Sequence, residues 1–278
     1  MNARRALTAF AVASVALALL AACAPSAETD ASSGAASGTD APATTTGPEL
    51  SGELTIFAAA SLGGPFDELA TRFEARNPSL DVLPVTYDGS SVLATQLVEG
   101  APADVFASAD EPNLDRVAEE GLVAGEPEVF ATNVLEIAVQ PGNPLSIDGL
   151  DALSIGADPA PVVVVCAAEV PCGRAAATLL DDAGVELSPA SEEQNVSAVL
   201  TKVRTGEADA GLVYVTDVRA ADGEVEGIEI DGADAATNRY PIAALAGAAN
   251  PAAAAAFVEF VRSSEGAEVL AEFGFGSP

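Results

Sequence analysis

From Leu50 onward, short apolar runs of strand length alternate with segments whose apolar residues recur every three to four positions. In the first such segment, Phe66, Leu69 and Phe73 share one face of a predicted helix that ends before Pro78. Strands that alternate with helices predict an α/β architecture with mostly parallel sheets. The predicted strands are 54–59, 81–87, 104–108, 134–139, 162–165, 210–214 and 240–245, and the later predicted helices are 91–99, 112–120, 174–183, 195–205, 252–262 and 264–273.

The N-terminus has the pattern of a bacterial export signal. Arg4 and Arg5 precede an apolar run, which ends in the small residues before Cys23. Leu20-Ala21-Ala22-Cys23 resembles a lipobox, so residues 1–22 are predicted to be a lipoprotein signal peptide and Cys23 the lipid anchor. A single transmembrane anchor is the alternative, but the run is slightly short for it and lacks a stop-transfer pattern.

Residues 23–49 are predicted to be the lipidated cysteine and a flexible tether. The stretch is almost wholly Ala, Ser, Thr, Gly, Pro and a few acids, which offers too little apolar bulk to offset the entropy of ordering. A lipid followed by such a tether leaves a domain free beside the membrane. The sequence therefore predicts an extracytoplasmic lipoprotein, anchored to the cell membrane of a bacterium.

The charge and the composition disfavour several functional classes. Asp and Glu number 42 against 11 Lys and Arg, and the resulting net charge of −31 would repel nucleic-acid phosphates. The chain has no His and a single lysine, Lys202, which excludes histidine-dependent catalysis and histidine-ligated metal sites. With no Trp and 5% aromatic residues, an aromatic platform for bases or sugars is also disfavoured.

Cys166 and Cys172 lie six residues apart, and in an exported protein a disulfide between them is the expected state. Two buried free thiols are the main alternative. A metal site would need further ligands, and a redox site would normally have the C-x-x-C spacing.

Four junctions between a predicted strand and a predicted helix carry glycine or small polar residues. The first N–H groups of a helix are unpaired and bear partial positive charge, so several such ends can hold an anion without Lys or Arg. Any one of these junctions, taken alone, is most often just an ordinary helix cap. The junctions are 60–63, 89–91, 171–173 and 194–196.

Three other candidates have simpler structural interpretations. Tyr214 ends an apolar strand, where a half-buried aromatic residue is common. Arg174 is expected to pair with one of the many acids rather than with a bound anion. Asp104 and Asp110 are expected to cap turns and helices rather than to form a carboxylate pair for acid–base catalysis.

Four segments together resemble the molybdate-binding proteins of ABC importers, the ModA family. They are LTIFAAASL at 54–62, GSSVLATQLVEGAPADVFASAD at 89–110, EVPCGR at 169–174 and NVSAVLTKVRTGEADAGLVY at 195–214. The resemblance implies a type II periplasmic-binding-protein fold, in which two α/β lobes close by a hinge on an anion in the cleft between them. The expected boundaries are 50–134 for lobe 1, 135–237 for lobe 2 and 238–278 for the return to lobe 1.

The resemblance also implies a set of oxyanion ligands. Ser61 and Ser90 would donate from hydroxyl and backbone, Cys172 and Val196 from backbone N–H groups, and Tyr214 from its phenol. Ser91 is a rival to Ser90. Hydrogen-bond donors alone suit a fully ionised tetraoxo dianion, since a protonated phosphate would meet no acceptor, and cage size would select against sulfate.

The resemblance further implies a monomeric receptor that catalyses nothing and uses no cofactor. It would bind molybdenum only as molybdate, accept tungstate, and deliver the anion to a membrane permease driven by a cytoplasmic ATPase. Arg174 and Ala175 depart from the family pattern, in which an aromatic residue is common after P-A-G, and this leaves the selectivity between the two anions open.

Three alternatives remain at this stage. A receptor for sulfate or phosphate would share the architecture. An enzyme with Ser61 as nucleophile would need a base within reach, for which Lys202 is the only lysine. A structural or adhesion lipoprotein would bind no small ligand.

Overall fold

The computed structural model describes residues 49–278. The predicted signal peptide, Cys23 and the predicted tether, apart from its last residue, lie outside the described residues. Within 49–278, no helix combines the length and the apolar character needed to cross a membrane.

The first lobe is built on a five-stranded sheet with the order β4-β2-β5-β12-β6. Its strands are β2 (Ile56–Ala59), β4 (Thr86–Asp88), β5 (Val105–Ala107), β6 (Val123–Asn133) and β12 (Asn238–Leu245), and a small separate sheet pairs β1 (Ser51–Leu54) with β3 (Ser79–Val82). Its helices are α1 (Gly63–Arg76), α2 (Ser90–Val98), α3 (Glu111–Glu119), α7 (Pro251–Val261) and α8 (Ser264–Glu272), with the short 3₁₀ helix η1 (Ala60–Leu62) before α1.

The second lobe has its own five-stranded sheet, with the order β11-β7-β10-β8-β9. Its strands are β7 (Leu135–Val139), β8 (Val163–Cys166), β9 (Ser191–Glu193), β10 (Ala210–Tyr214) and β11 (Glu226–Glu229). Its helices are α4 (Pro171–Ala183), α5 (Val196–Thr205) and α6 (Val215–Ala220), with 3₁₀ turns η2 (Leu150–Leu153) and η3 (Ala233–Ala236).

The apolar periodicity explains both cores. Phe66, Leu69 and Phe73 of α1 are buried against the first sheet, as their spacing predicts. In the second lobe every residue of β8 is buried, because helices cover both faces of a central parallel strand. The α/β, two-lobed fold expected from the sequence is therefore confirmed.

The prediction of mostly parallel sheets is wrong, because both sheets are mixed. Strand β12 runs antiparallel to β5 and β6, and β7 runs antiparallel to β10 and β11. The reason is topological: a strand that brings the chain into a lobe, β7 in the second and β12 in the first, starts at the boundary where the strands of the β-α units end, and so runs against them. The parallel pairs within these sheets join strands of the β-α units, such as β2 with β5 and β8 with β10.

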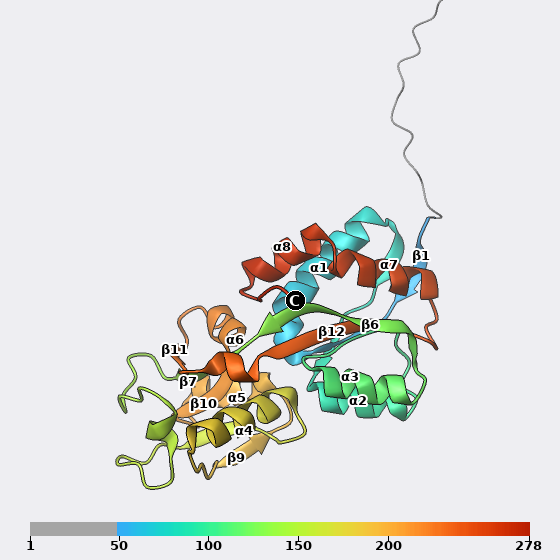
Figure 1. The fold of residues 1–278 in the computed structure, drawn as a ribbon. Coiled ribbons are helices and arrows are strands. Elements are labelled where there is room, and N and C mark those ends of the chain that lie inside the picture. The colour runs from blue at the N-terminus through green and yellow to red at the C-terminus, as the bar shows by residue number, and fades with distance from the viewer. Residues whose placement is uncertain (1–48) are drawn as a thin grey trace, which may run out of the picture. The chain divides into compact units, whose positions relative to one another are not determined.

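Strands β6 and β12 lie side by side and link the lobes (Figure 1). Asn133 at the end of β6 is opposite Asn238 at the start of β12, and β6 leads almost directly into β7. Strand β6 is absent from the sequence prediction, because Gly125 and Pro127 interrupt its apolar pattern. The structure accommodates both residues in an irregularity of the ladder opposite Ile242 and Ala244.

Other boundaries differ locally. The predicted strand 81–87 is two strands, β3 and β4, and α4 begins three residues before the predicted Arg174. The short elements α6, β9 and β11 were not predicted, since three to six residues carry too little periodicity.

Candidate functional site

One buried cavity between the lobes brings together all five predicted ligand residues. Residues of both lobes line it, and the space measures about 10 Å³, room for about one water molecule. The five residues are Ser61, Ser90, Cys172, Val196 and Tyr214, and each is buried.

The cavity lies where parallel strands of both sheets end. In the first lobe β2, β4 and β5 run parallel and are followed by the lining residues near Ser61, Ser90 and Ala109. In the second lobe β8, β9 and β10 run parallel and lead to Cys172, Val196 and Tyr214 respectively. The carboxyl ends of parallel strands are the usual ligand position in open α/β sheets.

Helix N-termini from both lobes therefore converge on the cavity. Ser90 is the first residue of α2, Cys172 the second of α4 and Val196 the first of α5. Backbone N–H groups at these positions have no acceptor within their own helix and carry partial positive charge. The cavity is thus lined by hydrogen-bond donors although the chain is strongly acidic.

Within residues 49–278, the hydroxyl group of each lining serine has one hydrogen-bond partner. The backbone N–H of Ala109 donates to Oγ of Ser90 over 2.9 Å, and Oγ of Ser61 lies 3.0 Å from the hydroxyl of Tyr240. Ser91, the rival of Ser90, lines a different pocket. The placement therefore favours Ser90 as the contact.

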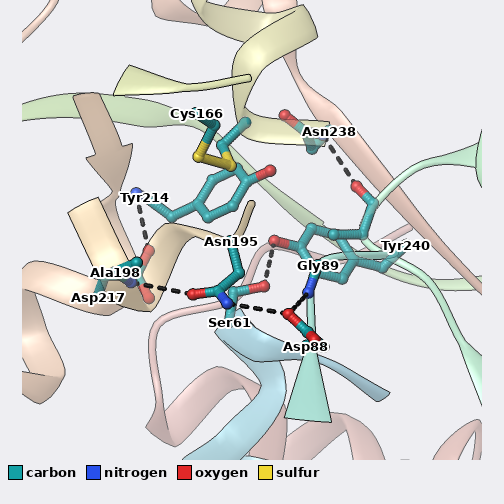
Figure 2. The surroundings of a disulfide bond; sticks show 12 residues. Ser61, Asp88, Gly89, Cys166, Asn195, Ala198, Tyr214, Asp217, Asn238 and Tyr240 are labelled. Carbon is teal, nitrogen blue, oxygen red and sulfur yellow. Dashed lines mark hydrogen bonds between the residues drawn. A yellow bond between two sulfur atoms is a disulfide. The ribbon is translucent and has the colours of Figure 1, made fainter. Parts of the chain in front are cut away.

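Tyr214 contributes a phenol whose proton is available. Its side chain is 1% exposed, and its hydroxyl has no hydrogen-bond partner within residues 49–278. Burial, reinforced by the nearby Tyr240 and Asp217, raises the pKa of Tyr214 well above its usual value, so the phenol remains a donor. The carboxylate of Asp217 accepts from the Tyr214 backbone N–H at 2.9 Å and holds the end of β10 (Figure 2).

Asp88 also lines the cavity but its Oδ1 is already engaged. It accepts from the backbone N–H of Gly89 at 2.8 Å and from Nδ2 of Asn195 at 2.9 Å (Figure 2). The second of these bonds crosses between the lobes, and Oδ1 of the same Asn195 caps α5 by accepting from Ala198. Sequence reasoning missed Asp88, since its role depends on a residue 107 positions away.

The lobes also approach at Gly89, where only glycine fits. A Cβ on Gly89 would lie 1.9 Å from the carbonyl oxygen of Gln194 in the other lobe, far inside contact distance. The backbone of Gly89 has φ −59°, which any residue adopts, so the requirement comes from the other lobe rather than from the local turn.

Arg174 forms an ion pair with Asp110 across the lobes, which confirms that it pairs with an acid of the protein. Asp110 also caps α3 by accepting from the Asn113 N–H. Asp104 accepts from the backbone of Thr55 and Asn250. The structural interpretation of both aspartates is thus confirmed.

Cys166 and Cys172 form the predicted disulfide, which joins the end of β8 to the first turn of α4. The next residue, Gly173, packs so tightly on the preceding loop that a Cβ would lie 1.9 Å from the Ala167 carbonyl oxygen. The disulfide and this contact fix the backbone of Cys172 at the cavity wall.

Lys202 does not serve Ser61 as a base. Its ammonium group forms an ion pair with Glu193 and a hydrogen bond of 2.9 Å to Ser191. The observed partner of the Ser61 hydroxyl is Tyr240, a phenol whose pKa burial raises further. Lys202 is therefore not the base that the nucleophile hypothesis needs.

Two α/β lobes, linked by adjacent strands and enclosing a cavity rich in donors, define a two-lobed solute-binding protein. The sequence pattern of the bacterial extracellular solute-binding proteins matches residues 54–276, and the chain belongs to that family. Among its relatives is the molybdate-binding protein ModA of Mycobacterium tuberculosis, which is 44% identical over 225 residues covering 81% of this chain and 85% of the relative.

Solved structures share the fold. The periplasmic molybdate-binding protein of Azotobacter vinelandii has a TM-score of 0.70 at 20% identity, covering 81% of this chain and 99% of its own. The sulfate-binding protein SubI of Mycobacterium tuberculosis has a TM-score of 0.67, also at 20% identity, covering 80% of this chain and 86% of its own. At 20% identity, the two structures show the fold alone and do not identify the ligand of this chain.

Proposed function

We propose that this protein captures molybdate, and also tungstate, outside the cytoplasm and delivers the anion to the permease of an ABC importer. The observation that carries the proposal is the cavity in which N-termini of α2, α4 and α5 meet the hydroxyls of Ser61, Ser90 and Tyr214. The relative from Mycobacterium tuberculosis, named a molybdate-binding protein, supports the choice of anion.

A cavity lined by donors suits a fully ionised tetraoxo dianion, because every oxygen of that ion is an acceptor. Oδ1 of Asp88, a carboxylate oxygen in the wall, already accepts two hydrogen bonds from the protein. A phosphate that retains a proton would bring a donor to a wall of donors. Discrimination against sulfate would rest on size, since a smaller ion forms longer and weaker bonds in the same cage.

The cavity is walled by residues of both lobes and measures about 10 Å³, so an anion would enter by separation of the lobes. Binding would then be a hinge motion about β6 and β12, with Asp88–Asn195 and Asp110–Arg174 remade as the lobes close.

The proposal also covers the oligomeric state, membrane attachment and partners of the protein. The receptor would be a monomer, held at the cell membrane by a lipid on Cys23 and freed from the surface by the tether. It would need no cofactor and would catalyse no reaction. Its partners would be the anion, the permease subunits and, through them, a cytoplasmic ATPase.

Thermal unfolding of the full chain in the presence of molybdate, tungstate, sulfate or phosphate tests the proposal. An anion at 100 times its dissociation constant adds about 2.7 kcal/mol of stability, which raises the midpoint by roughly 5–10 °C at this size. We expect a shift with molybdate and tungstate only. A shift with sulfate or phosphate would change the substrate, and no shift with any anion would favour the structural lipoprotein.

A further inference from the structure

Tyr240 lies behind the cavity, next to one of the residues that line it. It belongs to β12, one of the two linking strands, and is fully buried. Its hydroxyl is 3.0 Å from Oγ of Ser61, a residue 179 positions away (Figure 2). Tyr240 does not line the cavity itself, so its influence on a ligand would pass through a residue that does, and Ser61 is the lining residue whose hydroxyl it contacts.

Ser90, the other serine that lines the cavity, shows how a hydrogen bond to the oxygen of a serine leaves the serine's own proton free. Ser90 accepts a hydrogen bond from the Ala109 N–H, which occupies a lone pair of its Oγ and leaves its own proton free. A hydroxyl group has one proton and accepts at its lone pairs. If Ser61 is to donate its proton to an anion, the contact with Tyr240 must be one in which Tyr240 donates.

Tyr240 is suited to donate. Burial raises the pKa of the Tyr240 phenol and outweighs the opposing effects of Ser61, Asn133 and Tyr214 near its hydroxyl, so the phenol keeps its proton. Its ring is held by edge contacts with Phe130, Tyr214 and Phe275, at centroid distances of 6.3, 6.1 and 5.4 Å. The donor therefore has a fixed position and a single orientation of its ring.

We propose that Tyr240 is a positioning residue, which donates to Oγ of Ser61 and so directs the Ser61 proton into the cavity. The inference rests on the proposed function, since it assigns Ser61 to an oxyanion. It also explains why a tyrosine occupies this position in β12, a strand that does not line the cavity.

The test is a double-mutant cycle on molybdate affinity, measured by isothermal titration calorimetry. Tyr240→Phe keeps the ring and removes only the hydroxyl. We expect it to weaken binding by roughly three- to tenfold, the value of one ordinary hydrogen bond. In a Ser61→Ala background, Tyr240→Phe should have no further effect, because the group through which it acts is gone.

The three tyrosines of the chain supply a matched control. The hydroxyl of Tyr87 bonds to Gly63 and Asp67 in the first lobe, and Tyr87 is not among the residues lining the cavity. Tyr87→Phe should leave molybdate affinity unchanged. Unfolding midpoints without anion show whether each variant is folded.

Each outcome distinguishes the two proposals. Equal losses from Tyr240→Phe in both backgrounds would mean that Tyr240 acts through a group other than Ser61, such as Tyr214, whose ring it contacts, and would overturn the positioning role, as would wild-type affinity in Tyr240→Phe. Unchanged affinity in Ser61→Ala would remove Ser61, and with it Tyr240, from the site. Failure of the wild-type protein to bind any oxyanion would instead overturn the proposed function.

Discussion

Arg174 of the second lobe and Asp110 of the first are joined across the boundary between the lobes, with Nε of Arg174 2.9 Å from Oδ2 of Asp110. The pair stands beside the cavity, because Ala109 and Cys172, which line it, are close neighbours in the chain. Such a pair forms only when the lobes are closed, so it stabilises the closed state without touching the ligand.

Removing this pair should weaken molybdate binding. The side chain of Arg174 is 38% exposed, which limits the loss for Arg174→Gln to about two- to fivefold and makes it smaller at high salt. Arg204→Gln breaks an ion pair with Glu224 within the second lobe and should leave affinity unchanged.

Asp110→Asn distinguishes an effect on lobe closure from a long-range effect of charge on the bound anion. It keeps a side chain able to cap α3 but removes the negative partner of Arg174. If the ion pair acts by closing the lobes, binding weakens. If long-range charge dominates, loss of a carboxylate beside an anion site strengthens binding, and that result in titration calorimetry would contradict the role of the pair in closure.

Gly89→Ala should block closure while leaving each lobe folded. The added methyl group meets the Gln194 carbonyl only when the lobes are together, and φ at Gly89 is ordinary. We expect affinity to fall by roughly tenfold or more, in proportion to the lost population of the closed state. Gly63→Ala, where a Cβ meets nothing within 4 Å, is the control. Full affinity in Gly89→Ala would show that the lobes need not approach this closely.

Tyr214→Phe should weaken binding and leave the ligand-free fold as stable as before. The hydroxyl has no partner within the described chain, so its removal breaks no bond in the free protein. A donor to a charged, desolvated ligand is worth about 1.5–3 kcal/mol, or roughly ten- to 150-fold in affinity. Calorimetry gives the affinity and thermal unfolding the stability. Unchanged affinity would exclude the phenol from the site.

Asp217 should make stability fall as pH rises. Burial raises its pKa to about 7 from an ordinary value near 4. Between about pH 4 and 7 the folded chain keeps this proton while the unfolded chain has lost it, so the free energy of unfolding decreases with pH in that window.

Asp217→Asn should flatten that decrease relative to wild type, as measured by urea unfolding at a series of pH values. Glu136, whose pKa burial also raises, is present in both proteins and is itself one of the groups that raise the pKa of Asp217. Asp182→Asn on an exposed part of α4 is the matched control. Parallel curves for wild type and Asp217→Asn would mean that the carboxyl is ionised in the fold.

The elements most predictable from sequence were those with strong local patterns. The face formed by Phe66, Leu69 and Phe73 predicts α1, and the apolar run at β8 predicts a buried strand, because in each case burial follows from periodicity alone. Strand β6 could not be predicted in this way, since Gly125 and Pro127 break its pattern and only pairing with β12 makes it a strand.

The candidate site was likewise predictable only in part. The resemblance to a known family indicated Ser61, Ser90, Cys172, Val196 and Tyr214, and the structure places all five on one cavity. The residues that hold them were not predictable. Asp88–Asn195 and Ser61–Tyr240 join positions 107 and 179 residues apart, and nothing local in the sequence marks either pair.

The most direct test of the central claim is a crystal structure of the protein grown with molybdate, with anomalous scattering used to locate molybdenum. The account predicts one strong peak in the cavity between the lobes, with its oxygens within hydrogen-bond distance of Ser61, Ser90, Cys172, Val196 and Tyr214. A peak elsewhere on the protein, or a closed cavity without molybdenum at saturating concentration, would contradict it.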